Sequence, residues 1–309
     1  MVERRQGVVL SKTGGTYRVH TGGESVEAAL RGRLKRGESK QVLVGDSVTL
    51  HMHPDGSITV EEVLARRSLL KRRYPGRKHG VRSVAANVGQ VVVVGAARNP
   101  AWDPHLMDRF TAVAAANELP LVVVVNKCDL VNQTSGFGMP YQQAGYPVVY
   151  TSVKQEAGLA ELRRLLSGHV SLFTGPTGVG KSSLLNAFQP GLHLRTAAVS
   201  GKSQAGRHTT VSAEMYPLGE DGFVVDTPGL RDVGLWGLEP IEVAAAFPEF
   251  AARAMECRFD NCRHVQEPDC AVAQAVTRGD IAASRLESYR RMLEEADRAS
   301  RPWASGRSK

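Results

Sequence analysis

The segment Gly175–Ser182 constrains this sequence most strongly, because it fits the phosphate-binding pattern G-x-x-x-x-G-K-[ST]. It stands between a strand-like run, His169–Phe173, and a helix start, Ser183–Phe188. The glycines allow backbone N–H groups to turn inward around an anion, and the helix N-terminus adds its positive dipole. The sequence therefore predicts a phosphate-binding loop between a strand and a helix.

This loop suggests specific roles for its polar residues. The Lys181 ammonium is expected to reach the β- and γ-phosphates of a nucleotide and to act in catalysis, and the Ser182 hydroxyl to bind Mg²⁺. The residues of this segment predicted to bind nucleotide are Gly175, Pro176, Thr177, Gly178, Val179, Gly180, Lys181, Ser182 and Ser183.

A second motif, Asn126-Lys127-Cys128-Asp129, follows the β-branched run Leu121–Val125. The Asp129 carboxylate offers two acceptors, which suit the N1–H and exocyclic NH₂ of guanine, whereas adenine presents the wrong pattern. Lys127 is expected to lie against the base and Asn126 to tie two loops together. Cys128 belongs to the nucleotide-binding motif, and its side chain is expected to pack as a small hydrophobe. Taken alone, Asn and Asp at a strand end often only make a turn.

Thr151–Lys154 follows a third strand-like run, Val148–Tyr150. We expect Ser152 and its neighbours to form the second wall of the base site, with backbone N–H groups directed at O6 of guanine.

Asp226 begins Asp-Thr-Pro-Gly after the strand-like run Phe223–Val225. An Asp here is placed to hold Mg²⁺ through water, and the Gly229 N–H is placed to face the γ-phosphate.

The polar, Gly-rich segment Gly201–Thr210 is predicted to be a switch loop, although a mobile surface loop is the plain alternative. Thr209 or Thr210 is the candidate Mg²⁺ ligand, with Thr209 slightly preferred. Leu230 stands where many GTPases carry a Gln that orients the attacking water. His208 is the candidate to position that water, and a solvated loop histidine is the alternative.

These motifs occur in an unusual order along the chain. Ordinary GTPases have the phosphate loop first, whereas here the base motif at 126 and the wall at 151 precede it. This order predicts a circular permutation, which a fold tolerates where the chain termini lie close together. The usual ends would be joined where the helix Gly158–Ser167 runs into the strand His169–Phe173. The mobile segment after Gly229 then leads directly to the C-terminal domain, so nucleotide state is expected to move that domain.

A cluster of metal-ligand residue types lies near the C-terminus. Three thiols and one imidazole suit tetrahedral Zn²⁺, and a closed set of four ligands indicates a structural site. Paired buried thiols are the alternative. The predicted zinc ligands are Cys257, Cys262, His264 and Cys270.

The pattern of apolar residues changes along the chain and predicts several domains. Residues 1–64 contain short strand-like runs between turn signals, which favours a small β-barrel such as the oligonucleotide-binding (OB) fold. Residues 65–86 are interpreted as a basic linker or nucleic-acid contact, and residues 87–234 as an α/β domain with a doubly wound parallel sheet. Residues 235–309 are expected to be helical, with a basic tail. The strand-like runs of the predicted barrel are Gly7–Leu10, Tyr17–His20, Val42–Val44 and Ser47–His51. The last helix is predicted to span roughly Ile281–Arg298.

The net charge of +8 favours a polyanionic partner, although a basic globular protein without one has the same balance. The composition, 42% hydrophobic and 23% charged, is typical of a globular protein, and four cysteines are too few for a disulfide scaffold. No apolar run is long enough to span a membrane and no signal peptide is visible, so a cytoplasmic location is expected. The protein is also expected to be a monomer.

Taken together, the chain resembles the ribosome small-subunit-dependent GTPase A family, RsgA. The resemblance implies an OB-fold barrel, a circularly permuted GTPase domain and a helical zinc domain. It also implies late-stage maturation of the small ribosomal subunit, contact with 16S rRNA and GTPase activity stimulated by that subunit. Besides the cysteine spacing and the β-rich N-terminal region, the resemblance rests on Asn126–Asp129, Gly175–Ser183, Gly206–Thr210, Asp226–Gly229 and Gly234-Leu235-Trp236.

Two other functions are compatible with parts of the sequence. One is an RNA-binding assembly protein whose nucleotide site is vestigial. The other is an ATP-driven P-loop enzyme that acts on a small molecule, and Asp129 argues against it.

Overall fold

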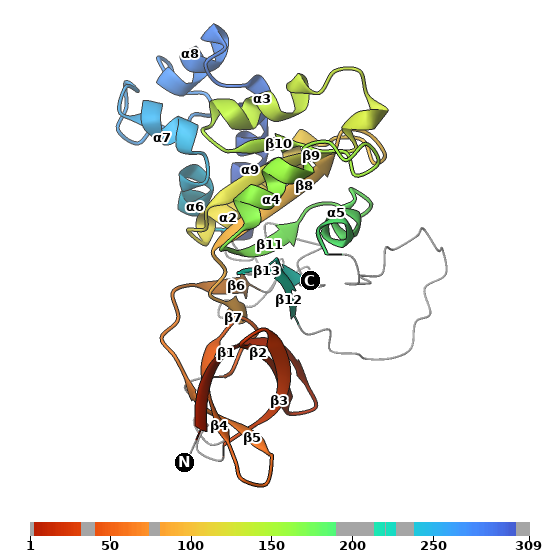
Figure 1. Cartoon of the computed structure of the whole chain (residues 1–309). Coiled ribbons are helices and arrows are strands. Elements are labelled where there is room, and N and C mark those ends of the chain that lie inside the picture. Colours follow the sequence, from red (N-terminus) through yellow and green to blue (C-terminus); the bar gives the residue numbers. More distant parts are fainter. Residues whose placement is uncertain are drawn as a thin grey trace, which may run out of the picture.

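The computed structural model describes residues 3–31, 41–73, 81–189, 213–219, 221–226 and 238–300. These residues form a β-barrel at one end, a central sheet flanked by helices, and a helical unit at the other end (Figure 1). The predicted multidomain architecture is therefore confirmed in its three principal parts.

The N-terminal barrel is closed, with the strand order β1-β2-β3-β5-β4. Alternate residues such as Val19, Leu50 and Val60 fill its interior, as expected for strands with one buried face. The predicted strand Val42–Val44 is wrong: these buried residues form an irregular segment that ends in a turn at Gly45, whose φ is 89°. The strands are β1 (Glu3–Thr13), β2 (Thr16–Thr21), β3 (Glu24–Leu30), β4 (Ser47–Met52) and β5 (Ile58–Val63).

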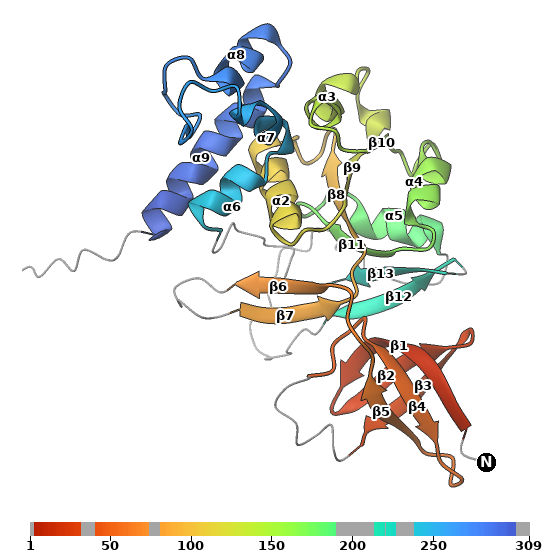
Figure 2. The same cartoon turned by 90° about the vertical axis from the view of Figure 1, so that its left-hand side faces the viewer.

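A two-stranded hairpin forms where the sequence predicted a linker. Its antiparallel strands, β6 (Leu69–Arg73) and β7 (Val81–Ala86), lie between the barrel and the central sheet (Figure 2). Their apolar ends enter a core that barrel and sheet residues complete. This shared core includes Leu10, Val44, Leu70, Ala85, Met215 and Val225. The barrel and the sheet are thus packed together through the hairpin.

The central sheet has the strand order β10-β9-β8-β11-β13-β12. The first five strands are parallel, and β12 pairs with β13 in the antiparallel direction. The sequence predicted a parallel sheet without this edge strand, in which Pro217 interrupts the apolar pattern. The strands are β8 (Gln90–Ala96), β9 (Leu121–Asn126), β10 (Val148–Tyr150), β11 (Val170–Thr174), β12 (Glu214–Leu218) and β13 (Gly222–Asp226).

Helices cover both faces of this sheet. Val91 and Val93 of β8 pack toward α2 and α3, whereas Val92 and Val94 pack toward α4 and α5. This alternation explains why the strands are continuous runs of valine. The helices are α2 (Pro104–Ala116), α3 (Ser135–Gln143), α4 (Leu159–Leu166) and α5 (Lys181–Phe188), and a short 3₁₀ turn, η1, spans Cys128–Leu130.

The C-terminal helical unit packs against α2 of the central domain (Figures 1 and 2). Ala112 of α2 is part of the core of this unit, together with Phe247, Tyr289 and Met292. Among the residues that the structure describes, no helix has the length and apolar character needed to cross a membrane. The helices of the unit are α6 (Pro240–Ala245), α7 (Pro248–Ala254), α8 (Ala271–Arg278) and α9 (Ala283–Ser300).

Candidate functional site

The predicted nucleotide-binding segments meet at one edge of the central sheet. Because β8, β9, β10, β11 and β13 are parallel, their carboxyl ends share that edge, where ligands of open α/β sheets bind. The base motif follows β9, the second wall follows β10, and the phosphate loop follows β11. Asp226 is the last residue of β13. The permuted order therefore does not separate these segments in space.

The phosphate loop connects β11 to α5 with backbone that favours glycine. Gly175, Gly178 and Gly180 have φ of 134°, 82° and 99°, and Gly180 is the N-cap of α5. Lys181 begins the helix and turns back over the loop, where its Nζ donates to the carbonyls of Gly175 (2.6 Å) and Pro176 (2.7 Å). Its positive charge thus lies beside the loop that is predicted to hold an anion.

Gly175 tolerates no side chain in this loop. A Cβ built there would lie 2.0 Å from the Val94 carbonyl oxygen, and the backbone φ is also unfavourable for other residues. We expect Gly175→Ala to lower the free energy of unfolding by about 3 kcal/mol, because a clash with backbone adds to left-handed strain. Denaturant unfolding measures this change.

Gly145→Ala is the matched control for this substitution. Gly145 has a φ of 86° but no atom within 4 Å of a built Cβ, so it reports left-handed strain without the clash. Equal losses of stability in the two variants would show that the close approach to Val94 is unimportant.

The buried Asn126 joins the base motif to two other segments. Its Nδ2 donates to the Val179 carbonyl at 2.9 Å, and its Oδ1 accepts from the Thr151 hydroxyl at 3.0 Å. Lys127 follows in the left-handed region (φ 59°), and its Nζ donates to the carbonyls of Gly178 (2.7 Å) and Asn99. Base loop, second wall and phosphate loop are therefore held together by direct hydrogen bonds.

Asp129 and Ser152 face each other across the base site. The Ser152 hydroxyl donates to Asp129 Oδ1 at 2.7 Å and accepts from the Gln155 backbone N–H at 3.1 Å. Ser152 is 1% exposed and its backbone pairs with Ala157, so the hydroxyl is fixed in place. This contact orients the carboxylate that is predicted to bind guanine.

Cys128 differs from its neighbours in the base motif. Its half-buried thiol donates to the Val125 carbonyl at 3.1 Å, and burial raises the pKa of the thiol. The side chain thus packs against β9, as predicted for a small hydrophobe.

The sequence reasoning missed one residue of this edge, Asn99. Its carbonyl accepts a hydrogen bond from Lys127, and the following Pro100 lies 3.8 Å from a Cβ built at Gly178. The available signal was its position shortly after β8, because every parallel strand of the sheet ends at this edge.

Several predicted site residues lie outside the described residues. These are the switch residues His208, Thr209 and Thr210, then Gly229 and Leu230, and the Gly234-Leu235-Trp236 motif.

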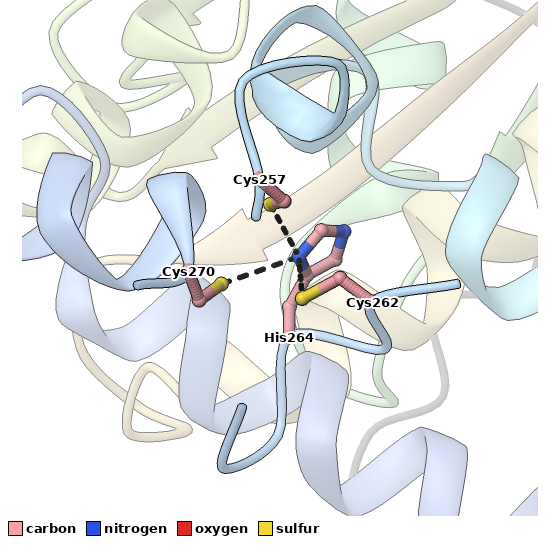
Figure 3. A group of neighbouring side chains, drawn as sticks. All are labelled: Cys257, Cys262, His264 and Cys270. Atoms are coloured by element: carbon pink, nitrogen blue, oxygen red, sulfur yellow. Dashed lines mark hydrogen bonds between the residues drawn. The ribbon is translucent and has the colours of Figure 1, made fainter. Parts of the chain in front are cut away.

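The four predicted metal ligands form a compact group in the helical unit (Figure 3). His264 Nδ1 lies 3.6, 3.5 and 3.4 Å from the Sγ atoms of Cys257, Cys262 and Cys270, and all four atoms lie within 4.8 Å of one another. Tetrahedral Zn–S and Zn–N bonds of usual length give an N···S separation of about 3.5 Å. The donor set therefore fits a zinc ion with no open position.

Neighbouring groups hold the ligand loop in shape. The Tyr289 hydroxyl donates to the Arg263 carbonyl at 2.9 Å, and Arg290 Nε donates to the His264 carbonyl at 3.2 Å. Burial opposes ionisation of Glu267, but backbone N–H groups of Arg263, Val265 and Gln266 lower its pKa to about 2. The loop is thus fixed by hydrogen bonds to α9 and to its own carboxylate.

Burial also acts on the ligands themselves. It raises the pKa of Cys262 to about 12, with hydrogen bonds to the other two thiols adding to the effect, and it lowers the pKa of His264. Burial thus favours the protonated form of the thiols. A bound divalent cation opposes this effect, because it stabilises the ionised thiolates.

Known proteins with the same architecture share sequence with this chain. The sequence model of the family described as RsgA GTPase matches residues 63–236. A protein of Gemmatimonas aurantiaca named small ribosomal subunit biogenesis GTPase RsgA is 46% identical, covering 96% of this chain and 98% of its own length. A protein of the same name from Moorella thermoacetica is 41% identical, over 94% and 97% of the two chains.

Two crystal structures extend the similarity to three dimensions. YjeQ from Thermotoga maritima superimposes with a TM-score of 0.78 at 35% identity, covering 97% of this chain and 100% of its own. YloQ, described as a circularly permuted GTPase, gives a TM-score of 0.75 at 27% identity, covering 97% and 98%. With its permuted sheet, closed barrel and cysteine–histidine cluster, this chain belongs to the RsgA GTPase family.

Proposed function

We propose that this protein hydrolyses GTP to GDP and phosphate and acts in the late maturation of the small ribosomal subunit. The observation that carries the proposal is the contact of the base motif with the phosphate loop, from Asn126 to Val179 and from Lys127 to Gly178. These bonds hold the base motif, which contains the proposed base-binding carboxylate of Asp129, beside the phosphate loop. The names of the relatives support the ribosomal role.

Each residue of the site has a role in this proposal. Asp129, oriented by Ser152, accepts hydrogen bonds from the guanine base, and Lys127 lies along its plane. Lys181 and the backbone N–H groups of Gly175–Ser183 bind phosphate oxygens. Ser182 and Thr209 are the proposed Mg²⁺ ligands, with Asp226 acting through water, and His208 is proposed to position the attacking water. Magnesium supplies charge neutralisation for phosphoryl transfer.

The metal centre has a structural role in the proposal. A zinc ion held by three thiolates and one imidazole has no vacant position for a substrate, so it would stabilise the helical unit.

The partner of the proposed enzyme is the small subunit and its 16S rRNA. The net charge of +8 favours such a polyanion. The barrel and the helical unit, which lie at opposite ends of the molecule, are the proposed rRNA contacts (Figure 1). We propose a monomer in the cytoplasm whose binding and release depend on the bound nucleotide.

The decisive experiment measures GTP hydrolysis with and without purified small subunits. We expect slow turnover by the protein alone and faster turnover with subunits. In competition between GTP and ATP, we expect GTP to occupy the site. An RNA-binding protein with a vestigial site would bind subunits without turnover. Equal affinity for subunits with GDP and with a non-hydrolysable GTP analogue would eliminate nucleotide-controlled release.

Lys181→Ala is expected to reduce turnover about 100- to 1,000-fold, because a fixed positive charge beside the transferred phosphoryl group is lost. Steady-state phosphate release measures the effect, both alone and with small subunits. In the assay without subunits, Lys71→Ala is the control, since Lys71 is exposed and lies on β6, outside the central sheet. Turnover in Lys181→Ala equal to that of the control would exclude this role.

A further inference from the structure

A buried arginine joins the helical unit to the central domain. Arg285 of α9 is 1% exposed, and its NH1 donates to Asp108 Oδ1 of α2 at 2.7 Å. Its Nε and NH2 bind the two carboxylate oxygens of Glu249 on α7, at 2.7 and 3.2 Å. Burial opposes the charge of Arg285, but the two carboxylates raise its pKa. A planar guanidinium binds one carboxylate through two bonds while a third N–H binds another, whereas an ammonium has no such rigid fork.

Arg285 also contacts aromatic rings of both domains. Its Cζ lies 4.4 Å from the ring centroid of Phe247 in the helical unit and 5.5 Å from that of Tyr141 on α3. The Tyr141 ring packs edge-on against Trp102, with centroids 6.2 Å apart. Trp102 in turn covers Gly95 at the end of β8 so closely that a Cβ there would lie 2.4 Å from its ring. Packed rings therefore connect Arg285 to the segment before α2.

This segment supports the nucleotide loops. Asp103 caps α2 by accepting from the Leu106 N–H at 3.1 Å, and Asp108 lies about 7.5 Å further along the helix axis. Four residues before the cap, the Asn99 carbonyl accepts from Lys127 Nζ, which also binds the Gly178 carbonyl. The position of Lys127 thus depends on the segment from Asn99 to the start of α2. Packing of Tyr141 on Trp102 and the bond from Arg285 to Asp108 hold that segment in place.

We infer that Arg285 is a positioning residue for the nucleotide site: it fixes α2 and the preceding segment, so that Asn99 holds Lys127 in place for the base. The inference rests on the proposed GTP-binding function and adds a residue of the helical unit to it. Lys127 contacts the nucleotide in the ground state and the transition state alike, so its displacement weakens binding without slowing the chemical step.

The test compares Arg285→Lys with the wild-type protein. The variant keeps the positive charge but lacks the planar fork that holds Asp108 and both oxygens of Glu249 in fixed positions. We expect the KM for GTP and the dissociation constant of a fluorescent GDP analogue to rise about 5-fold, the lower end of usual coupling between sites, with kcat unchanged. A merely structural role would lower kcat through loss of folded protein and leave KM unaltered.

Arg278→Ala is the matched control. Arg278 lies on α8 in the same unit and pairs with Asp280 of that unit, so KM and GDP affinity should stay at wild-type values. An unchanged KM in Arg285→Lys would overturn the inference. If the wild-type protein itself neither bound nor hydrolysed GTP, the proposed function would fail instead.

A second measurement uses only the wild-type protein and decides the question if Arg285→Lys does not fold. Coupling between two sites is reciprocal. If Arg285 positions the nucleotide site through α2, binding of GDP should in turn stabilise the contact of α9 with α2. Saturating GDP should therefore slow amide hydrogen exchange in α9 by about 5-fold. Equal exchange in α9 with and without GDP would contradict the inference.

Discussion

Asp129→Asn is expected to lower the affinity for GTP about 10,000-fold, because a site built to hydrogen-bond a substrate rejects a mismatched partner strongly. The carboxylate offers two acceptors to the two N–H donors of guanine, whereas the amide directs a donor at one of them. Xanthine carries an oxygen where guanine has its exocyclic amine, so xanthosine triphosphate should bind the variant. Competition binding with both nucleotides measures the loss of affinity for GTP and the gain of affinity for xanthosine triphosphate.

The Asp129→Asn substitution is expected to change the hydrogen-bonding groups of the side chain without changing its orientation. Ser152 Oγ donates to Asp129 Oδ1, and an asparagine carbonyl accepts the same bond, so the side chain keeps its orientation. Asp55→Asn, in an exposed barrel turn, controls for the loss of one negative charge. If Asp129→Asn bound GTP as the wild type does, Asp129 would have no part in base recognition.

Cys270→Ser is expected to lower zinc affinity by more than about 100-fold and to unfold the helical unit. Structural zinc contributes about 10 kcal/mol or more to folding of small metal-bound units, and the helices around this cluster are short. Cys270 is 4% exposed and packs in the core of the unit, so a serine there also buries a hydroxyl. Metal analysis gives the zinc content, and amide hydrogen exchange gives the loss of protection over residues 238–300.

Cys128→Ser is the matched control, because Cys128 lies in the base motif, away from the cluster. It should keep one zinc ion per chain and full protection of α8 and α9. Full zinc occupancy in Cys270→Ser would instead show that this thiol is not a ligand.

Motifs with a required backbone conformation were predictable from the sequence. The pattern Gly175–Ser182 requires glycines in the loop and a helix after it, and the structure has positive φ at Gly175, Gly178 and Gly180 and the helix α5. The helix begins at Lys181, two residues before the predicted start at Ser183. The valine runs of β8 and β9 are buried on both faces, which their composition indicated. The spacing of the cysteines and His264 likewise anticipated the cluster.

Elements that depend on distant partners were not predictable. Strand β12 contains a proline and exists because it pairs with β13 and packs beside the barrel. The hairpin β6–β7 has a basic sequence typical of a linker, and Leu70 and Ala85 are buried only because barrel and sheet residues complete a shared core around them. Val42–Val44 has strand composition, but Gly45 and the carboxylate of Asp46, which accepts from the Leu43 N–H at 2.7 Å, impose a turn.

The hydrophobic core shared by the barrel, hairpin and sheet bears on any attempt to shorten the chain. Leu10 and Val44 cover apolar side chains of β6, β12 and β13. A fragment starting after residue 64 would present those side chains to water, and the free barrel would carry its own uncovered apolar patch. Each piece would then gain an exposed apolar surface prone to aggregation, so the barrel and the central domain are expected to remain soluble only when they are expressed as one chain.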